Sequence, residues 1–261
     1  MKKYDKISFK NPFSWVVKVR NKDFKKLLNL NFTTYTNQTY SIGKYDFPYI
    51  SCKTIIYPDY LALYSEVQNY NKTPSTCVCF YQYDFLFDGI NGLFSAIYYN
   101  DKRLLNKFRE RFKDVRYFIS PDYSQCGDIN RIENLYRLFK ARIVSLWLIL
   151  EMGSIVIPNI TYADENYFEY MLDGMENCNV VAFSVKGSMR EVYQKELLIK
   201  AIKYTVDKMK NLSRIIVYSS STNDEVVLEL FSYATYHGIE VIIPNNILRE
   251  RNMKRKVSHC G

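Results

Sequence analysis

The sequence predicts an α/β fold in which repeated β-α units build a mainly parallel sheet. Two observations support this prediction. Seven short runs are apolar almost throughout, which is typical of parallel strands covered on both faces. Segments with helical periodicity separate most of these runs, and strands that alternate with helices indicate right-handed crossovers. A chain of 261 residues is long enough for one large domain of this kind.

The predicted strands follow a basic and aromatic segment, residues 1–48, that has little periodicity. In chain order the strands are 48–57, 76–83, 115–120, 154–160, 179–185, 214–219 and 239–244. They are rich in β-branched and aromatic residues, which favour strands. Most of them stop at a proline or at small polar residues, which is the usual chemistry of a turn.

The predicted helices lie between the strands, at 102–112, 131–151, 191–212 and 223–238. In the second helix Leu135 and Leu138 fall on one face. The fourth helix has a clear start and end, because Thr222 and Glu225 match the capping-box pattern and Gly238 is typical of a helix C-terminus.

Two architectures fit this order: a complete or incomplete barrel of the triosephosphate-isomerase type, and an open doubly wound sheet. The short crossovers, the number of repeats and the chain length favour the barrel. No glycine-rich Rossmann or P-loop motif follows a strand, which disfavours those nucleotide sites. We expect one α/β domain at 49–248, between the N-terminal segment, 1–48, and a basic C-terminal tail, 249–261.

The formal net charge of +9 is concentrated at the two ends of the chain. Residues 1–30 carry +7 and residues 249–261 carry +4, which leaves −2 for the middle. Basic ends on a nearly neutral body suggest contact with a polyanion, most simply nucleic acid. The competing interpretation is that these lysines and arginines only keep the protein soluble.

Several other classes of protein are disfavoured. The six cysteines have no zinc-finger spacing, so we expect reduced, structural thiols. The longest apolar stretch, which begins at Ile143, is interrupted by Glu151 and Gly153 and is too short to span a membrane. No secretory signal opens the sequence, so we expect a cytoplasmic protein without membrane contact. His237 and His259 form no histidine-based catalytic motif.

Polar side chains follow the predicted strands where each strand ends. Asp59, Asp84, Asp122, Asn159 and Lys186 are among them, and so are Tyr123 and Ser124, directly after Asp122. Ligands of parallel α/β folds bind at the carboxyl ends of the strands, so we expect these groups to share one polar pocket. The competing interpretation is that each residue is a helix cap or part of a turn.

Such a pocket could do two kinds of chemistry. Asp59, Asp84 and Asp122 could hold Mg²⁺ or Mn²⁺ through oxygen ligands. Alternatively, one aspartate with a raised pKa could act as general acid or base while Lys186 stabilises negative charge. Our candidate catalytic residues are therefore Asp84, Asp122 and Lys186, and Asn159 is a candidate for binding the substrate.

A resemblance to a known family rests on five segments, which follow one another in the same order. They are FYQYDF (80–85), PDYS (121–124), FKAR (139–142), IVIPNITY (155–162) and FSVKG (183–187). In these segments the chain resembles a bacterial family, domain of unknown function 4417, found on phages, plasmids and other mobile elements. The resemblance covers roughly residues 48–245. It emphasises the following positions of this chain: Asp84, Asp122, Tyr123, Ser124, Arg142, Pro158 and Gly187. The family usually has a tryptophan where Tyr162 stands.

The resemblance implies a protein of mobile DNA, which agrees with the basic ends. We therefore expect a protein that binds or processes nucleic acid, with Tyr123, Ser124 and Arg142 binding substrate beside Asp84, Asp122 and Lys186. Two alternatives stay open. One is a barrel enzyme that acts on a phosphorylated or sugar-like small molecule. The other is a phage-encoded inhibitor without catalytic activity that binds a host protein through its surface.

Overall fold

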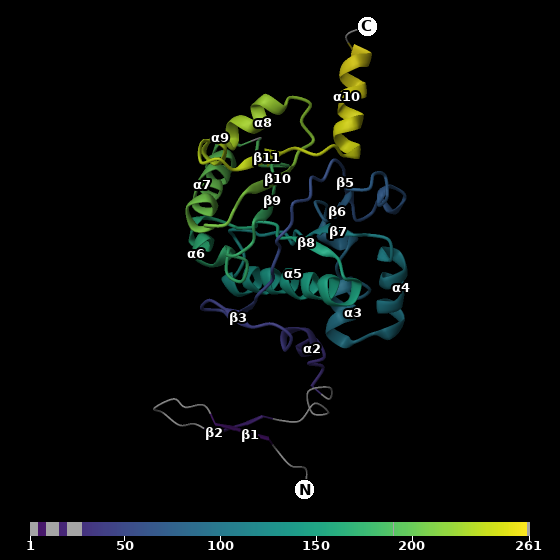
Figure 1. Cartoon of the computed structure of the whole chain (residues 1–261), viewed down its shortest axis with the longest axis vertical. Coiled ribbons are helices and arrows are strands. Elements are labelled where there is room, and N and C mark those ends of the chain that lie inside the picture. The colour runs from purple at the N-terminus through teal and green to yellow at the C-terminus, as the bar shows by residue number, and fades with distance from the viewer. Residues whose placement is uncertain (1–4, 9–15, 20–27, 190, 260–261) are drawn as a thin grey trace.

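The computed structural model describes residues 5–8, 16–19, 28–189 and 191–259 (Figure 1). Within the N-terminal segment, β1 (Asp5–Ser8) pairs antiparallel with β2 (Val16–Val19). A second antiparallel pair joins β3 (Ser41–Ile42) to β4 (Phe47–Pro48). Most of the basic residues in 1–30 lie outside the described residues, so the prediction that they bind a polyanion is not addressed by the structure.

Two parallel sheets form the centre of the molecule. The first has the order β5-β6-β7-β8 and the second the order β11-β10-β9, with every neighbouring pair parallel. Their strands are β5 (Leu61–Leu63), β6 (Cys77–Cys79), β7 (Tyr117–Ile119), β8 (Ile155–Ile157), β9 (Val180–Ser184), β10 (Arg214–Tyr218) and β11 (Glu240–Ile242). The α/β class with parallel pairing is therefore confirmed.

The two sheets meet at two isolated parallel bridges. Asn159 pairs with Ala182, which connects the end of β8 to β9, and Ile160 N donates to Ala182 O at 2.9 Å. Tyr60 pairs with Asn245, which connects the segment before β5 to the segment after β11, and Leu61 N donates to Asn245 O at 2.8 Å. The described residues thus form two sheets that touch at both edges, and no continuous barrel sheet is seen among them.

The first predicted strand, 48–57, is not a sheet strand. Thr54 N donates to Asn179 Oδ1 at 3.0 Å, and Asn179 Nδ2 donates to Thr54 O at 2.9 Å. Ile50 N donates to Gly174 O at 2.7 Å. Because these loop groups take up the backbone bonds of the segment, it runs extended without a ladder, and pairing begins only beyond Pro58, at β5.

The helices of the described segments surround the two sheets. They are α2 (Thr33–Thr36), α3 (Leu93–Tyr99), α4 (Lys102–Phe112), α5 (Arg131–Met152), α6 (Phe168–Met171), α7 (Val192–Lys208), α8 (Asp224–Leu230), α9 (Ser232–Tyr236) and α10 (Ile247–His259). Short 3-10 helices are η1 (Val67–Asn69), η2 (Asp84–Leu86) and η3 (Glu165–Tyr167). None of the helices in the described segments is long and apolar enough to cross a membrane.

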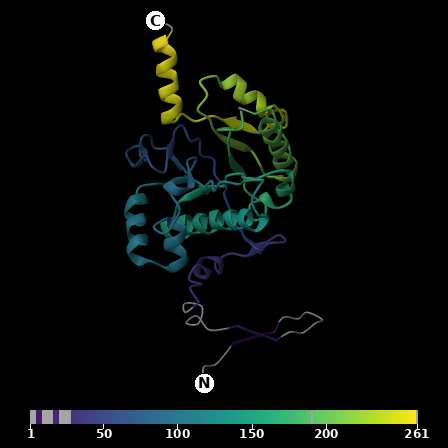
Figure 2. The same ribbon diagram turned by 180° about the vertical axis from the view of Figure 1, so that it is seen from behind.

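The predicted helices correspond to α4, α5, α7 and the pair α8 and α9, and α7 ends at Lys208, four residues before its predicted end. The helix predicted at 223–238 is divided into α8 and α9 at Phe231. Its cap is Asn223, whose side chain accepts from Glu225 N at 3.0 Å, and not Thr222. The predicted tail at 249–261 is largely helical, because α10 continues from Ile247 to His259. Both views show α10 projecting from the body at the end opposite β1 and β2 (Figures 1 and 2).

The core lies between the sheets and the long helix α5. Trp147 of α5 is fully buried, as are Phe118 of β7 and Phe183 of β9. Both faces of the central strands are covered, which explains why Cys77 and Cys79 are buried thiols with strongly raised pKa values. The prediction of structural cysteines fits four of the five described cysteines, and Cys126 is exposed.

Candidate functional site

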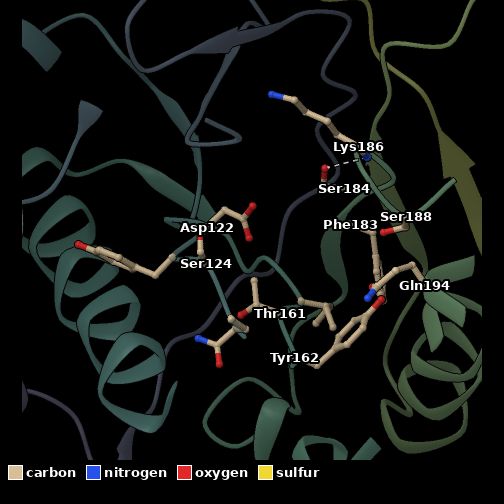
Figure 3. Close-up of a pocket in the computed structure, with 12 residues that line it drawn as sticks. Asp122, Ser124, Thr161, Tyr162, Phe183, Ser184, Lys186, Ser188 and Gln194 are labelled. Carbon is tan, nitrogen blue, oxygen red and sulfur yellow. Dashed lines mark hydrogen bonds between the residues drawn. The ribbon is translucent and has the colours of Figure 1, made fainter. Parts of the chain in front are cut away.

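A polar pocket of about 260 Å³ lies at the carboxyl ends of β7, β8 and β9 (Figure 3). The first turn of α7 contributes to its wall. Hydroxyl, amide and charged groups make up most of the lining, with a few apolar side chains. The lining residues are Asp122, Tyr123, Ser124, Gln125, Ile160, Thr161, Tyr162, Phe183, Ser184, Lys186, Ser188 and Gln194.

Parallel pairing explains why these groups meet. The backbone of Ser120, just past β7, still pairs with β8, since its N–H donates to Ile157 O at 2.8 Å. The next residue, Pro121, has no N–H with which to continue a ladder, so the chain leaves the sheet at Asp122. Phe183 and Ser184 close β9 on the other side of the pocket.

Asp122 is the most perturbed acid of the pocket. Burial raises its pKa from 3.8 to about 7, and the nearby negative charge of Asp84 acts in the same direction. A hydrogen bond from Asn159 Nδ2 to Asp122 Oδ1, 2.7 Å long, and the positive charge of Lys186 lower the pKa. A carboxyl group that titrates near pH 7 can both give and take a proton under physiological conditions.

Asn159 is hydrogen-bonded to Asp122 but does not itself line the pocket. Its Oδ1 accepts from Tyr81 Oη at 2.7 Å, and its backbone N–H donates to Ser120 Oγ at 2.8 Å. Since Oδ1 is occupied by a donor, the amide must present Nδ2 to Asp122. The structure therefore gives Asn159, a predicted substrate-binding residue, the position of a residue that orients Asp122.

Lys186, in the loop after β9, lines the same pocket, and its side chain runs away from Thr161 and Gln194 (Figure 3). Its backbone N–H donates to Ser184 Oγ at 3.2 Å, and its Nζ donates to Tyr81 O at 3.3 Å. Across the described ranges Lys186 forms no ion pair with an acid. Gly187 follows with a φ of 93°, a backbone conformation that other residues rarely adopt. The ammonium group is thus available to an anionic ligand.

Asp84 lies behind Ser124 and outside the pocket lining. Its carboxylate accepts from Ser124 Oγ at 2.9 Å and forms an ion pair with Arg137 Nη1 at 2.7 Å. The Ser124 N–H also donates to both carboxylate oxygens, at 3.2 Å. Asp84 and Asp122 are therefore close enough to interact electrostatically, but Asp84 holds the loop that carries Ser124 and does not face the cavity.

Tyr123 and Ser124, predicted to bind substrate, both line the pocket, whereas Arg142 does not. Arg142 is buried in α5 and donates from Nη2 to Met171 O at 3.3 Å and to Asp173 O at 3.2 Å. Burial lowers its pKa to about 10. Arg142, predicted to bind substrate, is therefore placed away from the pocket lining, where its Nη2 helps to hold the turn after α6 and its buried Nε has no hydrogen-bond partner among the described residues.

Some pocket residues carry no signal in the sequence. Gln125, Ser188 and Gln194 lie in loops or at a helix start, and nothing in their local pattern distinguishes them from solvated residues. Arg137, the partner of Asp84, also pairs with Glu133 one turn before it on α5, an ordinary surface pattern for a helix. The partner of an acid could not be chosen without knowing which helix faces the strand ends.

The predicted set of metal ligands is not assembled. Asp59 precedes β5 and so lies at the amino end of that strand, where Thr73 Oγ1 donates to it. It is therefore at the opposite edge of the sheet from Asp122. Among the described residues there is no group of three or more His, Cys, Asp or Glu side chains that could hold a metal ion.

Comparison with known proteins gives one family. A search of curated proteins finds no match. The family model for Domain of unknown function DUF4417 matches residues 39–236, which include both sheets except β11 and the whole pocket lining. Because this match covers most of the sequence and contains the site, the chain belongs to the DUF4417 family.

Proposed function

We propose that the chain is an enzyme that uses Asp122 as a general acid or base on a small ligand with phosphate and hydroxyl groups. The observation that carries this proposal is the pairing in one pocket of a carboxyl group of pKa about 7 with a lysine that has no ion-pair partner among the described residues. Perturbed acids of this kind are typical of catalytic sites.

The other pocket residues fit such a ligand. Ser124, Thr161 and Ser184 offer hydroxyl groups, while Gln125 and Gln194 offer amides that both donate and accept. A pocket of about 260 Å³ has the size for a sugar or a phosphorylated metabolite rather than for a polymer. In this proposal Lys186 binds the phosphate or stabilises developing negative charge, and Asp122 transfers the proton.

We infer in addition that the two sheets belong to an incomplete barrel. The two parallel bridges, Asn159 with Ala182 and Tyr60 with Asn245, join the sheets at both edges and support this inference. Active sites of barrel enzymes lie at the carboxyl ends of the strands, as the pocket does here. The architecture thus favours an enzyme over a protein that acts only through its surface.

Ligand binding tests the proposed function directly. Sugar phosphates, inorganic phosphate and free sugars are titrated into the full chain by calorimetry, alongside Lys186→Met and a control, Lys210→Met, in an exposed position after α7. We expect a phosphorylated sugar to bind the unmodified chain and the control equally. It should bind Lys186→Met at least about 10-fold more weakly, because that variant loses a charge-assisted hydrogen bond to the phosphate. Equal binding by all three proteins contradicts the proposal.

Nucleic-acid binding is a second candidate, and helix α10 favours it. Arg249 anchors this helix through Nη2, which lies 2.6 and 2.7 Å from the two carboxylate oxygens of Asp224. Arg251, Lys254 and Lys256 are exposed along the part that projects from the body (Figure 1). A helix with several exposed cations suits the phosphates of a duplex. A cytoplasmic role on a phage or plasmid fits this candidate.

A protein partner is the third candidate. An inhibitor from a phage would bind a host protein through its surface, with the pocket unused. Asp122→Asn separates this candidate from the enzyme, because a surface-acting inhibitor keeps its biological effect in that variant.

A further inference from the structure

A pair of aromatic side chains next to the pocket is left in solvent. Tyr83 and Phe85 are each 76% exposed, and their rings stack with centroids 5.9 Å apart and an interplanar angle of 13°. Leu86 and Ile90 in the same loop are exposed as well. Large apolar side chains at such exposure gain nothing from the core, and clusters of them commonly mark binding surfaces.

The loop that carries this pair is fixed to the wall of the pocket. Asp84, between the two aromatic residues, accepts from Ser124 N and Oγ, and Ser124 lines the pocket. On the far side of the pair, Phe87 is buried, with its ring 5.2 Å from that of Tyr123, another pocket residue. The loop that carries the exposed rings is therefore fixed on both sides of them to residues of the pocket wall, Ser124 and Tyr123.

The charges around the loop indicate which ligand fits. Asp84 is neutralised by Arg137, and Asp88 by Lys140. The loop thus presents flat rings with little net charge, while Lys186 in the adjacent pocket has no acidic partner in the described part of the chain. A ligand complementary to both features has a flat, uncharged ring at one end and an anionic group at the other.

We propose that Tyr83 and Phe85 form a stacking platform for a nucleobase, and that the phosphate of the same nucleotide enters the pocket toward Lys186. The placement of the phosphate rests on the proposed function, whereas the stacking of the base does not. Stacking on aromatic side chains suits every base, because each has a π-face. The ligand is a nucleotide, either free or at the end of a single strand.

Binding of AMP, ribose 5-phosphate and adenosine to the full chain tests the platform. The variants are Tyr83→Ala, Phe85→Ala and the conservative Tyr83→Phe, with Tyr236→Ala in α9, also highly exposed, as the control. We expect each alanine variant at the platform to weaken AMP about 5- to 100-fold, the range for loss of one base stack, and to leave ribose 5-phosphate unchanged. Tyr83→Phe and Tyr236→Ala should bind AMP as the unmodified chain does.

The outcomes separate the two proposals. Unchanged AMP affinity in both alanine variants, or an equal loss for AMP and ribose 5-phosphate, overturns the platform. No AMP binding by the unmodified chain also overturns it, whereas the proposed function stands if ribose 5-phosphate binds. If adenosine binding is weakened by Tyr83→Ala but not by Lys186→Met, the platform is supported. If AMP binding is also unaffected by Lys186→Met, the placement of the phosphate toward Lys186 is overturned. A single-stranded tetranucleotide that binds at least 10-fold more tightly than AMP identifies the end of a strand as the source of the nucleotide.

Discussion

Asn159 Nδ2 lies 2.7 Å from Asp122 Oδ1, and this hydrogen bond sets the orientation of the Asp122 carboxyl group in the pocket. Tyr81 Oη donates to Asn159 Oδ1 at the same distance. Tyr81, Asn159 and Asp122, which follow three different strands, are therefore joined by a chain of two hydrogen bonds. Desolvation pushes the Asp122 pKa up while Asn159 holds it down.

Removal of the amide should raise the pKa of Asp122. In Asn159→Ala the carboxylate loses the hydrogen bond that stabilises its charged form, so the pKa moves above about 7. Titration of ¹³C-labelled aspartate by NMR measures the change. Tyr81→Phe keeps the amide and should give a smaller rise in the same direction. A fall of the pKa in Asn159→Ala would contradict the geometry.

Removal of the Asp84 charge should have the opposite effect. Asp84 raises the pKa of Asp122 through charge repulsion, so Asp84→Asn lowers it, and the same NMR titration detects the shift. The substitution also weakens the ion pair with Arg137, so thermal unfolding must show that the variant is folded at the temperature of the titration. Glu133→Gln, which removes the other acid bonded to Arg137, serves as the control and should leave Asp122 unaffected.

Asp122 should make the folded state less stable as pH rises. Its folded pKa, about 7, lies above the unfolded value of 3.8, so the folded state binds the extra proton between these values. The free energy of unfolding should therefore fall from pH 4 to pH 7, by at most about 4 kcal/mol for this group. Asp122→Asn should lose this contribution, which urea unfolding at several pH values measures. A parallel pH dependence in both proteins would refute the assignment.

Arg142 should matter for stability and not for ligand binding. In Arg142→Met the carbonyl groups of Met171 and Asp173 lose their buried donor, which should cost about 1–3 kcal/mol of unfolding free energy. The affinity for a phosphorylated sugar should stay within about 2-fold of the original value, because Arg142 lies outside the pocket. A large loss of affinity with unchanged stability would instead support its predicted role in binding substrate.

The exposed cations of α10 should govern any binding to duplex DNA. Replacing Arg251, Lys254 and Lys256 by Gln removes three positive charges, which should reduce the slope of log affinity against log salt by about 2 to 3. Fluorescence anisotropy at several salt concentrations measures the slope. Lys102, Lys107 and Lys113, on or beside α4, provide a matched set of three charges whose replacement should leave the slope unchanged.

Local signals in the sequence were sufficient for part of this structure. The bounds of α4 agree with the predicted helix at 102–112, because Asp101 caps it by accepting from Leu104 N at 3.0 Å. Apolar runs also located six of the seven parallel strands. The run at 48–57 has the same composition, but its backbone bonds go to Asn179 and Gly174, which no local pattern reveals.

The candidate site, too, could be predicted from the sequence only in part. Asp122 and Lys186 could be selected because each follows a strand, and parallel strands end together. Asp59 follows a similar run, but the strand begins after it, so it lies at the other end of the sheet. The ion pair that turns Asp84 toward Ser124 involves Arg137 on α5, a contact that depends on how the helix packs. Sequence therefore identified strand ends better than it identified what their side chains contact.

The bridge between Tyr60 and Asn245 has a consequence for biosynthesis. It joins the start of the first sheet to a segment that the ribosome makes only after all the strands of both sheets. Until residue 245 has left the exit tunnel, the outer edge of β5 has unpaired backbone groups that another chain could bind. The nascent chain thus depends on the segment after β11 to cover this edge, and slow synthesis downstream of β10 lengthens the period in which aggregation competes with folding.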